Sequence, residues 1–298
     1  MIGNTLSRTA LLVAAARAAH LIVDAEPRIF RDTLAAALLG RQAERQLTFH
    51  RIFPGHQPLA GTRVEATCRS RFTEDRLAEA VDRGVDQYVI LGAGLDTFGY
   101  RSPLAERVRV FEVDHPATQG WKQQALATAK IAVPAGLTFV PVDFESQRLP
   151  DRLVAEGFDP TRPAFVSCLG VTQYLTRSAI AGTLADVGGF AAGTELAVEY
   201  VLPRHLIDRA GRSFVDSIME EAATSHEPWL SPLTPEEIGE LLHQHGFGTV
   251  RHVAQRDMID QRLWDRRDAL RPMGISVIAQ ATVGPVGPTG PPTGAAAG

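Results

Sequence analysis

The chain has 298 residues, of which 45% are hydrophobic and 21% charged, so it can bury a full core and has the composition of a globular protein. The net charge is −4, with acids and bases interspersed, and this pattern argues against a nucleic-acid or membrane partner. Cys68 and Cys168 lie far apart and outside any C-x-x-C pattern. We therefore expect a reduced, cytoplasmic protein without a disulfide, zinc or other metal site.

The first 86 residues are mainly helical in pattern. Alanine, leucine and arginine dominate residues 5–39, which predicts helix interrupted near Pro27, and arginine-rich residues 63–85 predict a second helix. Between them, residues 47–62 contain two prolines and two glycines and predict a loop. We expect residues 1–86 to cap the edge of a sheet.

A glycine turn follows the first predicted strand. Residues 88–91 form a short apolar block, typical of a strand buried on both faces of a parallel sheet, and Gly92 and Gly94 follow directly. Glycine allows a tight turn and the close approach of a ligand. In such sheets, an acid about twenty residues later commonly binds a ribose hydroxyl. Glu112 and Asp114 stand there, and we choose Asp114 because it lies just beyond the next strand.

The turn departs from a dinucleotide fingerprint. After Gly92, Ala93 and Gly94, the position of a third glycine holds Thr97, preceded by Asp96. An acid there would repel a pyrophosphate but suits a ligand that carries an ammonium and a sulfonium group. The loop therefore favours S-adenosylmethionine (SAM) over NAD, while a tight turn without a ligand is the structural alternative.

Strands and helices alternate through the middle of the chain. This order predicts an α/β protein with a doubly wound, mostly parallel sheet. The third strand ends at Asp143 and Phe144, where the acid could instead be the N-cap of a helix. The predicted strands are residues 108–113, 137–142, 164–169 and 195–201, and the predicted helices are residues 116–133, 149–158 and 178–190.

In the last hundred residues, strands and helices no longer alternate regularly. Residues 203–224 are polar and helical without a strand pattern, and a helix over residues 234–245 begins with Pro235 and two acids. Residues 249–254 and 276–281 are the last candidate strands. From residue 284 the chain is rich in glycine and proline, which predicts a disordered tail.

Five motifs in order resemble one family. They resemble the leucine carboxyl methyltransferase-like family of SAM-dependent methyltransferases, and its bacterial branch in particular. The motifs are Gly92-Ala-Gly-Leu-Asp-Thr97, Phe111-Glu-Val-Asp-His-Pro116, Val142-Asp-Phe-Glu145, Leu169-Gly-Val-Thr-Gln-Tyr-Leu175 and Trp229-Leu with Thr234-Pro-Glu-Glu237. The resemblance runs from Ser7 to about Val283.

This resemblance implies a fold and a set of cofactor contacts. The fold is a seven-stranded Rossmann-like sheet with N-terminal helices and a helical lid inserted after the fifth strand. Gly92 would support the methionine end of SAM, and Asp114 would hold the ribose hydroxyls. Asp143 and Phe144 would flank the adenine, and Arg71 would pair with the SAM carboxylate.

The implied layout is one SAM-dependent methyltransferase domain over residues 1–283. It comprises a cap (residues 1–86), a SAM-binding core (residues 87–202), a lid (residues 203–233) and a C-terminal part of the sheet (residues 234–283), followed by the tail (residues 284–298).

One position departs from the family. Leu169 stands where many members have a glutamate for the SAM amino group, so a backbone carbonyl at Leu169 or the Asp96 carboxylate would have to replace it. Tyr174, Tyr200 and Trp229 are candidates to line an acceptor pocket, where an aromatic face also attracts a sulfonium. Core packing is the ordinary role of such aromatics.

The expected reaction is the displacement of S-adenosylhomocysteine by a nucleophile that takes the SAM methyl group. A carboxylate of a small molecule would need no general base, and none is obvious in the motifs. A hydroxyl acceptor would need one, for which His115, His205 and His226 are candidates. An NAD(P)-dependent oxidoreductase and a non-catalytic SAM-binding protein are the rival functions.

Overall fold

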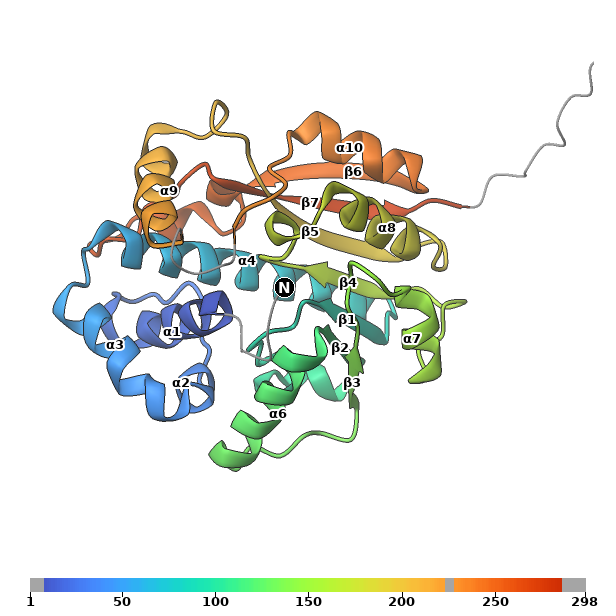
Figure 1. Cartoon of the computed structure of the whole chain (residues 1–298), viewed down its shortest axis with the longest axis horizontal. Helices are drawn as coiled ribbons and strands as arrows, with labels where there is room; N and C mark the ends of the chain where they lie inside the picture. Colours follow the sequence, from blue (N-terminus) through green and yellow to red (C-terminus); the bar gives the residue numbers. More distant parts are fainter. Residues whose placement is uncertain (1–7, 223–227, 286–298) are drawn as a thin grey trace, which may run out of the picture.

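The protein is built on one seven-stranded sheet flanked by helices (Figure 1). The computed structural model describes residues 8–222 and 228–285. The strand order is β3-β2-β1-β4-β5-β7-β6, and only β7 runs antiparallel to its neighbours within the sheet described. The expected α/β, doubly wound, mostly parallel sheet is therefore confirmed. The strands are β1 (Gln87–Leu91), β2 (Arg109–Asp114), β3 (Leu137–Pro141), β4 (Phe165–Cys168), β5 (Glu195–Val201), β6 (Phe247–Ala254) and β7 (Ser276–Val283).

Both faces of the central strands are buried. In β1, Val89 and Leu91 point into one hydrophobic cluster, whereas Tyr88 and Ile90 point into the cluster on the other face. This follows from the two-residue alternation of side chains along a strand. It explains why the sequence of β1 is continuously apolar, as predicted for a strand covered by helices on both faces.

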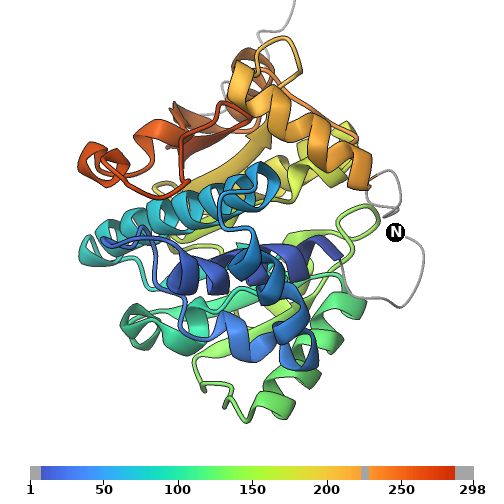
Figure 2. The same ribbon diagram turned by 90° about the vertical axis from the view of Figure 1, so that its left-hand side faces the viewer.

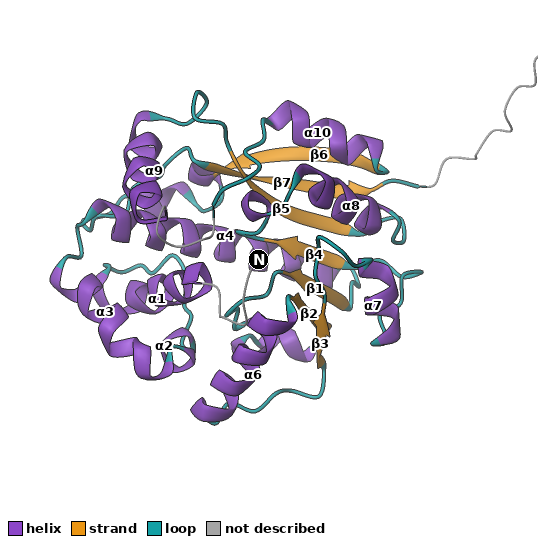
Figure 3. Cartoon of the chain, in the orientation of Figure 1, coloured by secondary structure: helices purple, strands orange, loops and turns teal. Residues whose placement is uncertain are grey.

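Helices cover the two faces of the sheet (Figure 3). Leucine, isoleucine and valine side chains of α7, α8 and α10 contact the Val89 face, and α4 covers the Tyr88 face. The helices after β1 are α5 (Phe98–Arg101), α6 (Pro116–Ala129), α7 (Leu149–Ala155), α8 (Arg177–Gly188), α9 (Arg209–Ala222) and α10 (Pro235–Gln244). Helix α10 begins with a capping box between Thr234 and Glu237, in agreement with its predicted start.

The N-terminal segment contains more helix than predicted. It forms α1 (Arg8–Val23), α2 (Ala35–Leu38), α3 (Ala43–Ile52) and the long α4 (Gln57–Asp82). The loop expected at residues 47–62 is wrong for most of its length. Pro58 lies in the first turn of α4, where its missing N–H costs no helical hydrogen bond. Gly61 lies where a Cβ would come within 2.4 Å of Phe214, so glycine there permits close contact with α9.

Parts of two expectations fall outside the described residues. The predicted tail is described only at Gly284 and Pro285, and His226 and its neighbours in the segment after α9 are likewise not covered. Over residues 8–222 and 228–285, the model contains no helix with both the length and the apolar character needed to cross a bilayer.

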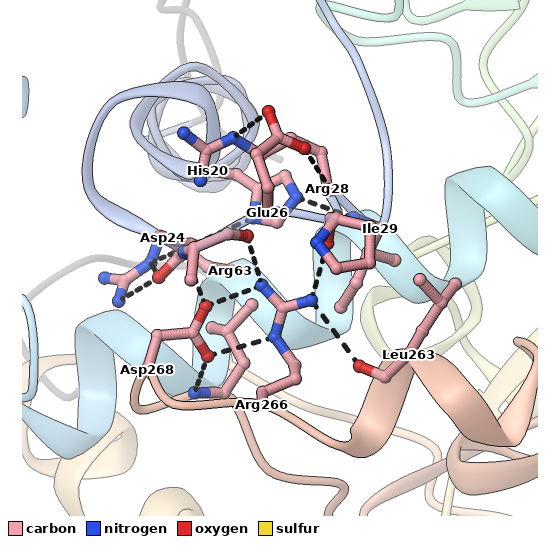
Figure 4. Close-up of polar contacts among 12 residues, drawn as sticks. His20, Asp24, Glu26, Arg28, Ile29, Arg63, Leu263, Arg266 and Asp268 are labelled. Carbon is pink, nitrogen blue, oxygen red and sulfur yellow. Dashed lines mark hydrogen bonds and ion pairs between the residues drawn. The ribbon is translucent and has the colours of Figure 1, made fainter.

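A buried polar cluster attaches α1 to α4 (Figure 4). The fully buried Arg63 guanidinium donates to both carboxylate oxygens of Asp24, with Nε 2.9 Å from Oδ2 and Nη2 3.0 Å from Oδ1. His20 Nδ1 lies 2.8 Å from the same carboxylate. Nearby, Arg266 donates to the Ala25 and Pro27 carbonyls, and Asp268 accepts from the Ala25 N–H. These bonds fix the N-terminal helices to the rest of the protein.

The N-terminal helices and α9 lie together beside the sheet, away from α7, α8 and α10 (Figures 1 and 2). Helix α1 packs against α3 and α4, and α4 in turn packs against α9. The segments before β1 and after β5 therefore meet in space although they are far apart in sequence.

Candidate functional site

The turn after β1 has the geometry that only glycine adopts readily. Gly92 and Gly94 have φ angles of +69° and +46°. The N–H groups of Gly92 and Ala93 both donate to the Val113 carbonyl, at 2.8 and 3.0 Å, so the turn folds back onto β2. A Cβ on Gly92 would lie 2.2 Å from Val171 Cγ2. The turn is thus wedged between β2 and the segment that follows β4.

Helix α1 holds the same turn from the outside. The Arg17 Nη2 donates to the Leu95 carbonyl at 2.6 Å, and its Nε donates to Asp32 Oδ2 at 2.7 Å. Both side chains are buried. The Arg17 guanidinium therefore links the loop after β1 to the N-terminal helices. Burial alone would raise the pKa of Asp32, but the nearby Arg17 charge helps to keep that pKa below its usual value.

Asp114 connects the ends of β1 and β2. Its Oδ2 accepts from the Gly94 N–H at 2.5 Å, and its Oδ1 accepts from the His115 N–H at 2.7 Å. Burial raises the pKa of this carboxyl group, and the two backbone N–H groups oppose that shift. Each carboxylate oxygen has a further lone pair available, so these bonds leave capacity for ribose hydroxyls.

The other expected cofactor residues also have structural roles. Asp96 accepts from the Phe98 N–H at 2.7 Å, at the start of α5. The Asp143 carboxylate accepts from the Glu145 N–H and the Ser146 hydroxyl, both at 3.0 Å, and so caps the turn after β3. Phe144 is partly buried against the core. Asp143 therefore caps a turn and not a helix, because the next helix begins at Leu149 with Arg148 as its N-cap residue.

Leu169 and Gly170 follow β4 at the point where the strand order reverses. β1 pairs with β2 on one side and with β4 on the other, so the carboxyl ends of β1 and β4 border the crevice where ligands of doubly wound sheets bind. Leu169 is partly buried against the α4 face of the core. The Gly92 turn and Asp114 therefore lie on the rim of this crevice.

Arg69 reaches this region, whereas Arg71 does not. Arg71 pairs with Asp75 one turn along α4, at 2.7 Å, and both side chains are 44% exposed. Arg69 lies against Gly170, where a Cβ would be 2.8 Å from its guanidinium, and Nη1 donates to Glu199 Oε2 at 2.8 Å. Two residues along a helix turn the side chain by about 200°, so only one of the two arginines can face the sheet edge.

A cavity of about 190 Å³ opens beside the crevice. It is slightly larger than the ~150 Å³ engineered cavity that accommodates benzene, so it suits an acceptor with a single ring or a short chain. The walls come from α1, α3, α4, the segment after β4, the ends of β5 and β7, and α9. Helices from both ends of the chain therefore enclose it.

Two of the three expected aromatic residues line this cavity. Tyr174 and Trp229 face it, beside Phe214 of α9. Tyr200 does not, because it is fully buried in the core and its hydroxyl lies 3.0 Å from His252 Nδ1. Its position in β5 directs it to the opposite face of the sheet from Glu199.

The cavity wall is more polar than the sequence suggested. Glu65, Arg69 and Glu199 line it, as does Arg8. Burial and the nearby Glu199 charge raise the pKa of Glu65 to about 8. The Gln173 amide oxygen is buried without a hydrogen-bond partner among the described residues.

Histidines play little part in the wall. His50 lines it, but burial and the Arg63 charge lower its pKa to about 4. His115 begins α6 and accepts from the Ala117 N–H through Nδ1, and His205 is exposed.

Glu65 and Glu199 were not predicted as site residues, and Arg69 was one of five arginines in residues 63–85 of which one could reach the pocket. A usable signal existed for Glu199, because it is an acid within the otherwise apolar run of β5 and a buried charge there needs a partner. Glu65 and Arg69 are four residues apart on α4, so their side chains share one face of that helix.

The fold and the site together define a class I SAM-dependent methyltransferase. Residues 10–188 match the family model described as leucine carboxyl methyltransferase, and the chain belongs to this family. YktD of Bacillus subtilis, a candidate SAM-dependent methyltransferase, is 37% identical over 204 residues, which are 68% of this chain and 67% of YktD. A candidate methyltransferase of Mycolicibacterium paratuberculosis is 32% identical over 208 residues, with 67% and 68% covered.

Solved structures agree on the fold. A methyltransferase candidate from Thermobifida fusca superposes with a TM-score of 0.57 at 16% identity, over 95% of this chain and 96% of that one. A protein from Streptomyces avermitilis gives a TM-score of 0.54 at 17% identity, over 91% and 97%. The family assignment makes this protein a methyltransferase with SAM as its cofactor, and it overrules the oxidoreductase and the non-catalytic alternatives.

Proposed function

We propose that this methyltransferase transfers the methyl group to a carboxylate of a small molecule and so forms a methyl ester. One observation carries the proposal. Arg8 lines the proposed acceptor cavity, the described histidine on its wall, His50, is too weak a base to deprotonate a hydroxyl, and Glu65, whose pKa is raised to about 8, is largely protonated at neutral pH. A carboxylate has a reference pKa near 4 and is already ionised at neutral pH, so it needs no base.

The residues of the crevice fit the cofactor. The Gly92 turn leaves no side chain between the backbone and the methionine end, and the Asp114 carboxylate would hold the ribose hydroxyls. Arg69 replaces Arg71 as our candidate for the SAM carboxylate, because it lies beside Gly170. Asp143 and Phe144 keep their proposed places around the adenine. When bound, SAM supplies an electrophilic methyl group and leaves as S-adenosylhomocysteine.

The chain's own contribution is alignment and exclusion of water. We propose that residues 1–86 form the cap, residues 203–233 the lid, residues 87–202 the SAM-binding core and residues 234–283 the remaining part of one domain. Holding donor and acceptor in line can contribute about 7–11 kcal/mol to lowering the barrier. We also keep the cytoplasm as the proposed location, since the described cysteines are buried free thiols.

The proposal is tested by the chemical stability of the product. The protein is incubated with methyl-labelled SAM and pairs of small carboxylic acids and alcohols with the same ring or chain. Methyl esters release labelled methanol in mild alkali, whereas methyl ethers do not. Alkali-labile label from the acids supports ester formation, and label found solely in alkali-stable products of the alcohols refutes it.

Matched arginine variants test the cofactor contact. Arg69→Ala should weaken SAM binding, measured by calorimetry, by about tenfold or more, because a hydrogen bond to a charged group contributes roughly 1.5–3 kcal/mol. Arg71→Ala is the control from the same helix and should leave the affinity unchanged, since its partner is Asp75 on the surface. The reverse order of effects would restore the original assignment of Arg71.

A further inference from the structure

Two carboxyl groups meet at the wall of the acceptor cavity. Ser276 Oγ lies between them, 2.8 Å from Glu65 Oε2 and 3.0 Å from Glu199 Oε1. Gln255 Nε2 donates to the remaining oxygen of Glu65, and Arg69 Nη1 donates to the remaining oxygen of Glu199 at 2.8 Å. Every oxygen of the two carboxyl groups is therefore engaged. We call Glu65, Ser276 and Glu199 the acid bridge.

The acid bridge requires one additional proton. The Ser276 hydroxyl has a single hydrogen, so it can donate to just one of its two carboxyl neighbours. The second short O···O contact needs a hydrogen from a carboxylic acid. Glu199 forms the ion pair with Arg69, which makes Glu65 the protonated partner. The Glu65 acid then donates to Ser276, and Ser276 donates to the Glu199 carboxylate.

Titration supports this proton count. Burial, together with the Glu199 charge, raises the pKa of Glu65 to about 8. Arg69 on α4 and Arg8 on α1 also line this cavity. Burial raises the pKa of Cys68 on α4 and, to about 12, that of Cys168 on β4. His50 on α3 has a pKa near 4.

We propose that Glu65 is the residue that determines acceptor specificity: as a carboxylic acid it lets the cavity hold an anionic acceptor, and as a carboxylate it excludes one. The inference rests on the proposed ester formation, because it concerns how a carboxylate enters this cavity. Loss of the proton adds one negative charge to a wall that the acceptor must approach. Like charges at close range in a partly dry site repel strongly.

Benzoate is a suitable probe, because one ring fits a cavity of this volume. Its affinity for the full chain is measured by calorimetry at pH 7 and pH 9 with saturating S-adenosylhomocysteine. For the wild type we expect a loss of about tenfold between these values, since a group with a pKa near 8 is largely protonated at the lower pH and largely ionised at the higher. Benzamide, which is neutral, should bind equally at both.

Glu65→Gln removes the titration while it keeps a side chain of the same shape. Benzoate affinity in this variant should be the same at pH 7 and pH 9, and Glu65→Leu provides a second variant without a charge if the first does not fold. Glu74→Gln is the matched control. Burial also raises the pKa of Glu74, to about 7, but this residue pairs with Arg101 away from the cavity. Glu74→Gln should therefore still lose about tenfold in benzoate affinity between pH 7 and pH 9.

Infrared difference spectra test the proton directly, without an acceptor. The wild type should show a protonated carboxylic acid that ionises near pH 8, and Glu65→Gln should lack that band. The inference is overturned if the band is unchanged in Glu65→Gln, if wild type and Glu65→Gln lose benzoate affinity alike, or if benzoate does not bind at pH 7. Methyl transfer to alcohols alone, with the pH-dependent benzoate binding intact, would refute ester formation and support the role of Glu65.

Discussion

Replacing Gly92 by alanine tests the geometry of the cofactor turn. The alanine would keep a φ of +69°, which costs about 1–2 kcal/mol for a residue with a Cβ. Its Cβ would also lie 2.2 Å from Val171 Cγ2, and overpacking of this kind costs about 1–3 kcal/mol. Together these terms lower the free energy of unfolding by about 2–5 kcal/mol. With an unfolding entropy of about 2.1 cal/mol/K per residue, 1 kcal/mol shifts Tm by about 1.6 °C in a chain of 298 residues, so Tm should fall by at least about 3 °C.

Gly94→Ala is the matched control for the backbone term. Gly94 also has a positive φ, but the nearest atom to its Cβ would be Ala10 Cβ at 3.5 Å, an ordinary contact. Thermal unfolding should therefore show a smaller loss for Gly94→Ala, by about 1–3 kcal/mol. In a Val171→Ala background, the cost of Gly92→Ala should drop to the Gly94→Ala value. The close contact between residue 92 and Val171 would be refuted if Gly92→Ala and Gly94→Ala lowered the free energy of unfolding equally. It would also be refuted if Val171→Ala did not reduce the loss caused by Gly92→Ala.

Three further changes test other parts of the structure. Asp114→Asn removes a charged acceptor and should weaken SAM binding in calorimetry by about tenfold or more; the amide oxygen can accept from just one of the Gly94 and His115 N–H groups, so the free energy of unfolding should also fall by about 1–3 kcal/mol, and unaltered affinity would contradict the role in SAM binding. Arg63→Ala removes the arginine that pairs with the buried Asp24 carboxylate, leaving His20 Nδ1 as its remaining side-chain contact, and should cost about 3–5 kcal/mol in urea unfolding, against about 0–1 kcal/mol for Arg71→Ala; similar costs would show that the buried pair adds nothing. Because Glu65 has a raised pKa in the folded state, the wild type should lose stability relative to Glu65→Gln as the pH rises from about 4.5 to about 8; parallel urea midpoints over this range would contradict the buried proton.

Most of the strands were predictable because they are short apolar runs between glycine, proline or polar residues, whereas β6 contains Arg251 and His252 and begins two residues earlier than predicted. β5 was predicted with the boundaries that the structure shows, and β1 differs by one residue. The N-terminal helices were harder, because prolines and glycines there read as a loop. Pro58 starts α4, and Gly61 accommodates a contact with α9 that lies more than 150 residues later in the sequence. Local sequence carries no sign of such a partner.

In the candidate site, too, some residues could be predicted from local sequence and others could not. Gly92 and Asp114 could be predicted because the constraint on each comes from its own strand end. The choice between Arg69 and Arg71 depends on how α4 is rotated against the sheet, and that rotation is set by packing. The proposed role of Glu65 depends on Glu199, which lies 134 positions later along the chain and is connected to Glu65 through Ser276.

With the SAM site proposed above, the bonds from Arg17 to Leu95 and Asp32 would give the first helix a share in cofactor affinity. Ordering of the loop by SAM should slow amide hydrogen exchange in α1 as well as in residues 92–98, although α1 comes first in the sequence and the loop follows some seventy residues later. A chain trimmed of its first two dozen residues would lose the Arg17 bonds to Leu95 and Asp32 and would also leave the buried Arg63 without Asp24. Deletions at the amino terminus should therefore change both the stability of the protein and the loop after β1.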